Sequence, residues 1–279
     1  MVRLLGLGDN TVDTYVDYGQ QFPGGNAVNV AVLSRRLGAA ASYIGCLGDD
    51  EAGDLVYHAL AAEGVDLGRC RRAHGANARA LIGHIDGDRR FLSSQPGTRA
   101  AFRLEADDFA AMAAHDVTHT SVNSDLDQML PAIKASARFL SYDLSEKWTG
   151  ERLSRIAPHV DILFLSDPRG SDESSESVAR IGAAHGPHTV LVTRGRAGVL
   201  AVISDEVHHQ DTVSTNIVDT LGAGDGFIAG FLIARLTGAG ATASLAAGAA
   251  MAAHVCTYRG AFGHGVPWAH PEAPITNTG

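Results

Sequence analysis

The chain has 279 residues, of which 45% are hydrophobic and 19% charged, with 32 glycines and 9 prolines. This composition supplies enough apolar material for a buried core and too little charge for a disordered chain. The formal net charge of −9, with basic residues scattered along the chain, argues against nucleic acid or an anionic membrane as a partner. We expect one large domain with a small appendage.

Short β-rich runs alternate with helical patterns, which is typical of a parallel sheet covered by helices on both faces. We predict strands over residues 3–8, 42–47, 116–121, 138–142, 160–165 and 189–193. Between them we predict helices over residues 27–37, 51–63, 105–114, 125–137, 150–157 and 174–185. Two more strands, over residues 198–203 and 206–210, precede two Ala-rich helices that begin near residues 224 and 241. The fold class is therefore a doubly wound, mainly parallel α/β domain.

Two segments interrupt this alternation. Residues 11–22 form a polar-alternating β segment, and residues 78–94 read as strand, turn and strand, with the turn at Asp86-Gly87-Asp88. Together they predict a small β lid, built from about residues 11–22 and 78–98, on a single domain that spans residues 1–279. An ordinary edge hairpin is the alternative.

The cysteines and the apolar segments indicate where the protein works. Cys46, Cys70 and Cys256 lie far apart and form no Cys-x-x-Cys pair, which argues against a disulfide framework or a zinc knuckle. Residues 1–6 lead directly into a strand, without the features of a signal peptide, so we expect a cytoplasmic protein. Residues 236–253 lack charge but are mostly Ala and Gly, which favours a buried helix over a membrane span.

The most informative stretch is Val218-Asp219-Thr220-Leu221-Gly222-Ala223-Gly224-Asp225, which leads into the helix predicted near residue 224. Gly222 and Gly224 let the backbone approach a ligand closely, and the free amides at the helix start attract an anion. Asp225 lies beside that anion, where a carboxylate accepts a proton from a hydroxyl that attacks phosphorus. Alternatively, Asp225 is an N-cap residue and the glycines form a tight turn.

A second group of polar residues follows the first strand and the Gly24-Gly25 pair. Asn26 and Asn29 are three residues apart, so both face one side of a first helical turn and offer donors and acceptors to a polyol. Ligands bind at strand ends in open α/β sheets, so this position favours a binding site over capping and turn formation alone. The group consists of Asp9, Asn10, Asp13, Asn26 and Asn29.

A third cluster, Thr193-Arg194-Gly195-Arg196-Ala197-Gly198, is similar to a nucleotide-phosphate loop but weak as a lone pattern. The chain has neither a Gly-x-x-x-x-Gly-Lys-Ser/Thr loop nor a well-placed Gly-x-Gly-x-x-Gly, and it lacks the Gly-x-Ser-x-Gly of hydrolases. The 13 histidines show no His-Glu-x-x-His spacing, so we interpret them as core or surface residues rather than metal ligands.

Four motifs, in their order along the chain, resemble those of the ribokinase-like (PfkB) carbohydrate kinases. They are Gly24-Gly25-Asn26, Gly48-Asp49-Asp50, Thr193-Arg194-Gly195 and Asp219-Thr220-Leu221-Gly222-Ala223-Gly224-Asp225. The resemblance covers nearly the whole chain. It implies a doubly wound α/β domain with a small β lid, ATP as phosphoryl donor, Mg²⁺, and often a monovalent cation such as K⁺.

The resemblance also implies roles for the residues that match the family's motifs. The base would be Asp225, and the anion hole would be formed by Gly222, Ala223 and Gly224. The sugar-binding positions match Asp9, Asp13, Gly25, Asn26 and Asn29. The nucleotide site would contain Thr193, Gly195, Gly198, Gly222 and Gly224, and the monovalent cation would lie near Asp219.

One stretch departs from the family's pattern. Many members carry Asn-x-x-Glu after a middle strand, where it serves magnesium and phosphate through water. The corresponding stretch here is Ser166-Asp167-Pro168-Arg169, so the magnesium ligands stay open, with Asp167, Asp172 and Glu173 as possible substitutes.

Several stretches are similar to the fructoselysine 6-kinases within this family, namely residues 8–13, 24–32, 142–148 and 258–261. This likeness implies phosphorylation of the 6-hydroxyl of a fructosamine. One alternative is a ribokinase or fructokinase that acts on a free sugar. Another is a non-catalytic sugar or nucleotide sensor, against which the presence of Asp225 argues.

A fructosamine adds an amino-acid arm with charged groups to the sugar. Candidate partners for that arm are Arg90 and Arg99 beside the lid, and Lys147 with Trp148, although each is also compatible with a solvated surface position. The exposed β surface of the lid predicts a homodimer.

Overall fold

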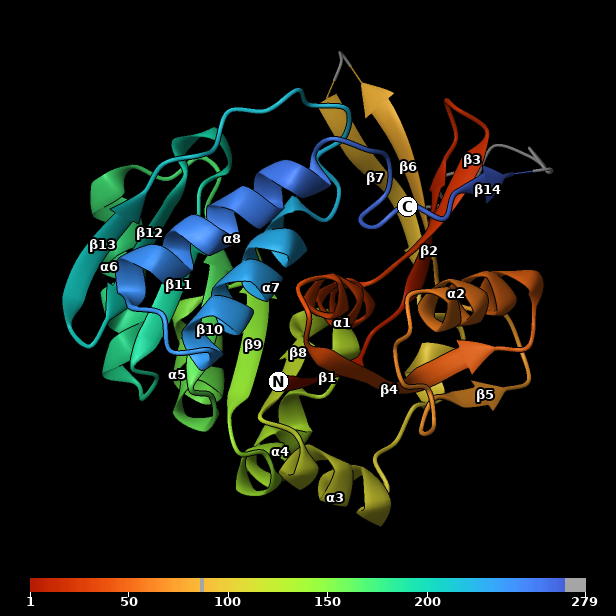
Figure 1. Cartoon of the computed structure of the whole chain (residues 1–279), viewed down its shortest axis with the longest axis horizontal. Coiled ribbons are helices and arrows are strands. Elements are labelled where there is room, and N and C mark those ends of the chain that lie inside the picture. The colour runs from red at the N-terminus through yellow and green to blue at the C-terminus, as the bar shows by residue number, and fades with distance from the viewer. Residues whose placement is uncertain (86–87, 269–279) are drawn as a thin grey trace.

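The computed structural model describes residues 1–85 and 88–268, which form an α/β structure with two sheets (Figure 1). Within these residues the larger sheet has nine strands. In spatial order they are β13 (Glu206–Gln210), β12 (Val199–Ile203), β11 (Thr189–Thr193), β10 (Ile162–Ser166), β9 (Leu140–Ser145), β8 (Val117–Ser121), β1 (Arg3–Gly8), β4 (Ala40–Gly48) and β5 (Arg71–Ala73).

Strand order in the larger sheet reverses at β1. This strand pairs in parallel with β4 on one side and with β8 on the other, and the parallel pairing continues through β9 and β10 to β11. β12 and β13 complete the sheet in antiparallel fashion. Ligands of open α/β sheets bind outside the carboxyl ends of the strands at such a reversal. The doubly wound, mainly parallel fold predicted from the sequence is confirmed.

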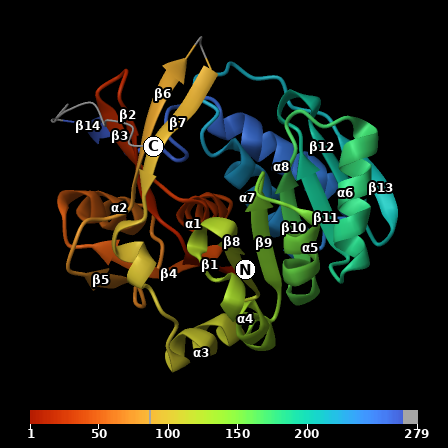
Figure 2. The same ribbon diagram turned by 180° about the vertical axis from the view of Figure 1, so that it is seen from behind.

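Helices cover both faces of the larger sheet. One face carries α1 (Asn26–Arg36), α2 (Glu51–Ala62), α7 (Ala223–Leu236) and α8 (Ala241–Val255), as Figure 1 shows. The other carries α3 (Ala106–Ala114), α4 (Leu130–Ser136), α5 (Gly150–Ile156) and α6 (Asp172–Ala184), which lie in front when the molecule is seen from behind (Figure 2). Each layer has its own hydrophobic core, because alternate side chains of the buried strands point to opposite faces.

The smaller sheet contains the two segments that interrupt the alternation of the sequence. Its spatial order is β14 (Val266–Pro267), β3 (Gln20–Gly24), β2 (Thr11–Tyr15), β6 (Arg79–Ile85) and β7 (Asp88–Gln95). β2 pairs antiparallel with β3 and parallel with β6, which joins the two segments. Residues 86 and 87 of the predicted turn lie outside the described residues.

The structure differs from the predicted elements most clearly in one delayed helix and in two short strands. The helix predicted over residues 125–137 begins only at Leu130, because Asp125 adopts a left-handed conformation (φ 57°) and Pro131 lies at the start of the helix. The sequence analysis missed β5 and β14, which have three and two residues and are too short for a periodic pattern. Nowhere in the part of the chain that the structure describes is a helix long and apolar enough to span a membrane.

Candidate active site

The first turn of α1 is held at the carboxyl end of β1. Gly25 precedes the helix with a φ of 109°, and a side chain there would approach the Cα of Asn10 to 2.6 Å, so only glycine permits this turn. The carboxylate of Asp9 accepts hydrogen bonds from the backbone N–H groups of Asn26 (2.6 Å) and Ala27 (3.2 Å). Asp9 therefore caps α1 across space.

The buried carboxylate of Asp9 also accepts from two hydroxyl groups. The Oγ atoms of Ser121 and Ser124 lie 2.9 Å and 3.0 Å from its Oδ1. These partners support the capping role that the sequence left open. A contact between Asp9 and a sugar stays a prediction.

The side chains of Asn26 and Asn29 reach from α1 to the first turn of α7. Both amides donate to Asp225, from Asn26 Nδ2 to Oδ1 (2.7 Å) and from Asn29 Nδ2 to Oδ2 (2.6 Å). The other amide atom of Asn29, Oδ1, is buried without a hydrogen-bond partner among the described residues. The structure thus joins three residues of the predicted site and leaves an acceptor that suits a hydroxyl group.

Asp225 lies beside the amides of the first turn of α7. Gly222 caps this helix in a left-handed conformation (φ 77°), and a Cβ there would approach the Cβ of Ala261 to 2.4 Å. The amides of Gly224 and Asp225 belong to the first turn, where no acceptor exists within the helix. A space for an anion next to a carboxylate is the arrangement expected for base-assisted phosphoryl transfer.

A second carboxylate, which the sequence analysis missed, shares the amide of Asn26. Asn26 Nδ2 also donates to Asp143 Oδ2 (2.9 Å), so these oxygens of Asp143 and Asp225 lie within about 6 Å of each other. Burial raises the pKa of Asp143 to about 7, and the charge of Asp225 adds to this rise. The signal in the sequence was the position of Asp143 near the end of a predicted strand.

Asp219 joins the loop before α7 to the smaller sheet. Its carboxylate accepts hydrogen bonds from the Tyr15 hydroxyl (2.5 Å) and from the backbone N–H groups of Leu221 (3.0 Å) and Gly260 (3.1 Å). These donors give Asp219 a role in shaping the loop. Its contact with a monovalent cation stays a prediction.

A cavity of about 650 Å³ opens beside the first turn of α7. It contains five residues of the predicted nucleotide and anion sites, namely Thr193, Gly195, Gly198, Ala223 and Gly224. Its remaining wall includes residues 211–215, Ile217 and one side of α8, which the sequence analysis missed because they carry no recognisable motif. The volume is in the range of small-molecule sites, and an adenine nucleotide fits such a space.

The residues considered for magnesium do not form a ligand cluster. Asp172 is paired with Arg194, and Glu173 is exposed at the start of α6. Within residues 1–85 and 88–268, no group of three or more His, Cys, Asp or Glu side chains could hold a metal ion. The magnesium ligands therefore stay open.

The residues considered for an amino-acid arm fall into three cases. Lys147 Nζ donates to Asn123 Oδ1 (2.7 Å), and Trp148 Nε1 donates to the carbonyl of Ser166 (2.9 Å) while its ring packs against a hydrophobic core. The Nε of Arg99 is buried and lacks a hydrogen-bond partner within the described residues. Arg90 lies on β7, and its side chain lies outside the described part of the structure.

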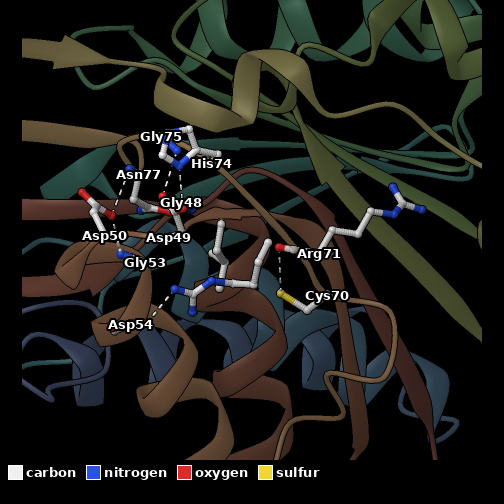
Figure 3. A network of polar contacts seen from close by, with 12 residues as sticks. Gly48, Asp49, Asp50, Gly53, Asp54, Cys70, Arg71, His74, Gly75 and Asn77 are labelled. Carbon is white, nitrogen blue, oxygen red and sulfur yellow. Dashed lines mark hydrogen bonds and ion pairs between the residues drawn. The ribbon is translucent and has the colours of Figure 1, made fainter.

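The Gly48-Asp49-Asp50 motif fixes the segment that enters β6 (Figure 3). Asp50 caps α2 by accepting from Gly53 N (3.0 Å), and the same oxygen accepts from Asn77 N (3.1 Å). Asp49 accepts from Gly75 N (2.9 Å) and contacts His74 Nδ1 (2.8 Å). This motif therefore connects the segment before β6, a strand of the smaller sheet, to the end of β4 in the larger sheet.

Comparison with known proteins agrees with this geometry. Residues 3–268 match the model of the pfkB family of carbohydrate kinases. The chain belongs to this family. The match spans the whole described structure from β1 to β14, which confirms the resemblance inferred from four short motifs, and the protein is a carbohydrate kinase.

Two curated relatives and one solved structure illustrate the position of this pfkB kinase within its family. The chain is 39% identical over 271 residues to the fructosamine kinase FrlD of Bacillus subtilis, covering 96% of this chain and 95% of the relative. It is 35% identical over 262 residues to the fructoselysine 6-kinase of Escherichia coli, covering 94% and 100%. A ribokinase of Arabidopsis thaliana, solved with ribose and ATP, shares the fold with a TM-score of 0.81 at 23% identity, covering 94% of each chain.

The raised pKa of Asp143 predicts a pH-dependent gain in stability for Asp143→Asn. The folded pKa of about 7 lies above the unfolded value of about 3.9, so the folded state binds this proton more tightly and loses stability as the pH rises between these values. The variant removes the charge and keeps one amide oxygen for the two donors of Asp143, which are Asn26 Nδ2 (2.9 Å) and Ser145 N (2.8 Å); the loss of the second acceptor does not depend on pH. The difference in free energy of unfolding between the variant and the parent should therefore rise from pH 4 and level off above pH 7, with a total rise of up to about 4 kcal/mol.

Urea unfolding at pH 4.5, 6, 7 and 8 measures this difference. The matched control is Asp125→Asn, an exposed position in a left-handed conformation that Asn tolerates, where the difference should stay small at every pH. A difference for Asp143→Asn that does not grow with pH would contradict the prediction.

Proposed function

We propose that this pfkB kinase transfers the terminal phosphoryl group of ATP to the 6-hydroxyl of a fructosamine such as fructoselysine. The observation that carries the proposal is the position of Asp225, held by two asparagine amides beside the first-turn amides of α7 and the large cavity. The two curated relatives, named fructosamine kinase and fructoselysine 6-kinase, support this substrate class because each aligns with nearly the whole chain.

Asp225 acts as the general base in this proposal. Its carboxylate accepts the proton of the sugar hydroxyl as the oxygen forms a bond to the terminal phosphorus, and the bond from that phosphorus to the bridging oxygen breaks, which releases ADP. Asn26 and Asn29 hold both carboxylate oxygens, so the base is oriented before the substrate arrives. Gly222, Ala223 and Gly224 surround the anion hole, in which the amide of Gly224 has no acceptor within the helix.

ATP binds in the cavity of about 650 Å³, whose wall includes Thr193, Gly195 and Gly198. We propose that magnesium enters with the nucleotide, since Mg²⁺ commonly keeps several waters and binds through substrate phosphates. A monovalent cation such as K⁺ near Asp219 belongs to the same proposal.

We propose that the smaller sheet acts as a lid over the sugar. Tyr15 on β2 donates to Asp219 in the loop before α7, so this sheet already contacts the segment that leads to the base. Closure would exclude water, which otherwise competes with the sugar hydroxyl for the phosphoryl group. Asp13, in the middle of β2, and Gly25, directly after β3, would line the sugar side of this lid.

The first prediction of the proposed function concerns the base. Asp225→Asn removes the proton acceptor but keeps the anion hole, so turnover should fall by about two to four orders of magnitude while nucleotide affinity changes little. A coupled assay of ADP release measures turnover, and titration calorimetry measures nucleotide affinity. The exposed variant Asp125→Asn serves as control, and turnover of Asp225→Asn within about threefold of the parent would contradict the assignment.

The second prediction concerns the substrate. Fructoselysine or a related fructosamine should show a kcat/KM at least about tenfold above that of fructose or ribose, equivalent to about 1.4 kcal/mol of transition-state discrimination. The measurement is ADP release with each sugar under saturating ATP and magnesium. Fructose or ribose at or above every fructosamine would indicate a fructokinase or ribokinase, and no turnover with any sugar would indicate a sensor.

The third prediction concerns assembly. β7 is an edge strand of the smaller sheet, and it exposes Phe91 (60%) and Leu92 (50%), so we propose that two chains pair through this sheet. Sedimentation at micromolar protein should give about twice the 29.1 kDa mass of one chain. Leu92→Lys should shift the equilibrium towards monomers, and a monomeric parent would remove the dimer without affecting the lid.

A further inference from the structure

A chain of buried hydrogen bonds runs from the middle of the larger sheet to the proposed base. His119 on β8 and Ser141 on β9 are opposite each other in the parallel register of these strands, and both are fully buried. His119 Nδ1 lies 2.9 Å from Ser141 Oγ, and His119 Nε2 lies 2.8 Å from Asn26 Oδ1. The opposite end of the same amide, Asn26 Nδ2, holds Asp143 and Asp225.

Only one assignment of donors and acceptors satisfies every hydrogen bond in this series. Asp225, when ionised, is only an acceptor, so the atom of Asn26 that faces it must be the donor Nδ2. Oδ1 of Asn26 then faces His119, which must present an N–H group at Nε2. His119 Nδ1 is consequently the acceptor, and the hydroxyl of Ser141 donates to it.

The imidazole of His119 can donate at Nε2 and accept at Nδ1 because the ring is neutral. Burial lowers the pKa of His119 to about 3, so the ring carries one proton at neutral pH, and Ser141 fixes that proton on Nε2. If the amide of Asn26 rotated by half a turn, its oxygen would face two carboxyl groups. The hydrogen bond from His119 opposes that rotation.

We propose that His119 is a positioning residue for the kinase reaction, which locks the amide of Asn26 so that one NH₂ group holds both Asp225 and Asp143. The proposal rests on the function proposed above, because it takes Asp225 as the base. His119 does not touch the reacting atoms; it acts through Asn26. This role exceeds that of the core histidine that the sequence analysis expected.

The decisive comparison is between His119→Leu and His119→Gln. Leucine fills the space without a donor, whereas glutamine keeps a donor for Asn26 and an acceptor for Ser141. His119→Leu should lower kcat by about 10- to 100-fold with little change in nucleotide affinity, since a displaced base reacts poorly. His119→Gln should stay within about threefold of the parent.

The pH profile of kcat/KM distinguishes a displaced Asp225 from a simple loss of folded protein. A hydrogen bond to the ionised carboxylate lowers its pKa, so a weakened bond from Asn26 should move the acidic limb of kcat/KM for His119→Leu upward by about one pH unit. Titratable groups on the neighbouring elements include Asp9 after β1 and Asp143 on β9, and both variants retain them. His119→Gln should leave the limb in place.

Ser141→Ala tests the same chain with a smaller change, in case His119→Leu does not fold. Without the donating hydroxyl, the proton of the imidazole is no longer confined to Nε2, so kcat should fall and the limb should move in the same direction to a smaller extent. A folded His119→Leu or Ser141→Ala with parental kcat and an unshifted limb would overturn the inference. If Asp225→Asn loses turnover in that case, the proposed function stands; if Asp225→Asn keeps turnover, the proposed function fails.

Discussion

The carboxylate of Asp9 holds the amino end of α1 against the carboxyl edge of the larger sheet, and the rest of the site depends on that contact. A helix start has unsatisfied N–H groups and a partial positive charge, so a buried carboxylate at the end of β1 satisfies both at once. The first turn of α1 is thereby fixed in place. Because Asn26 and Asn29 lie on that turn, their amides reach α7 at a defined position.

The fixed position of the Asn26 amide has an electrostatic consequence for two carboxyl groups. Asn26 has a single NH₂ group, and both of its hydrogens point to carboxyl groups, which brings Asp143 close to Asp225. Burial and, to a smaller extent, the charge of Asp225 raise the pKa of Asp143, so the site is less stable when both groups are ionised. Buried ionisable groups that raise one another's pKa are common at functional sites. The hydrophobic cores of this protein follow the usual pattern of apolar burial, whereas this site does not.

The smaller sheet is joined to the same centre from two directions. Asp49 and Asp50 fasten the segment that enters β6 to the end of β4 and the start of α2. Tyr15 on β2 binds Asp219, whose carboxylate also shapes the loop before α7. A movement of this sheet would therefore also displace the loop that precedes α7 and Asp225.

The sequence by itself determined the elements and the motifs, because both depend on local patterns. Apolar runs of five or six residues and helical periodicity give the order of strands and helices, and the ordered glycine motifs identify the family. Gly25 and Gly222 were recognisable because backbone turns before a helix require them. The sequence did not reveal β5, because three residues are too short for a periodic pattern. It also placed the start of α4 too early, because Asp125 and Pro131 delay the helix.

Only the tertiary structure decided which of these residues act together. Asn26 and Asp225 are 199 residues apart, and no local pattern states that the first turns of α1 and α7 meet. His119 reads as a core histidine until strand order and register place Ser141 on one side of its ring and Asn26 on the other. Local hydrogen bonds and periodic burial are encoded by neighbours in the chain, whereas a polar network depends on how strands are ordered and in what register they pair.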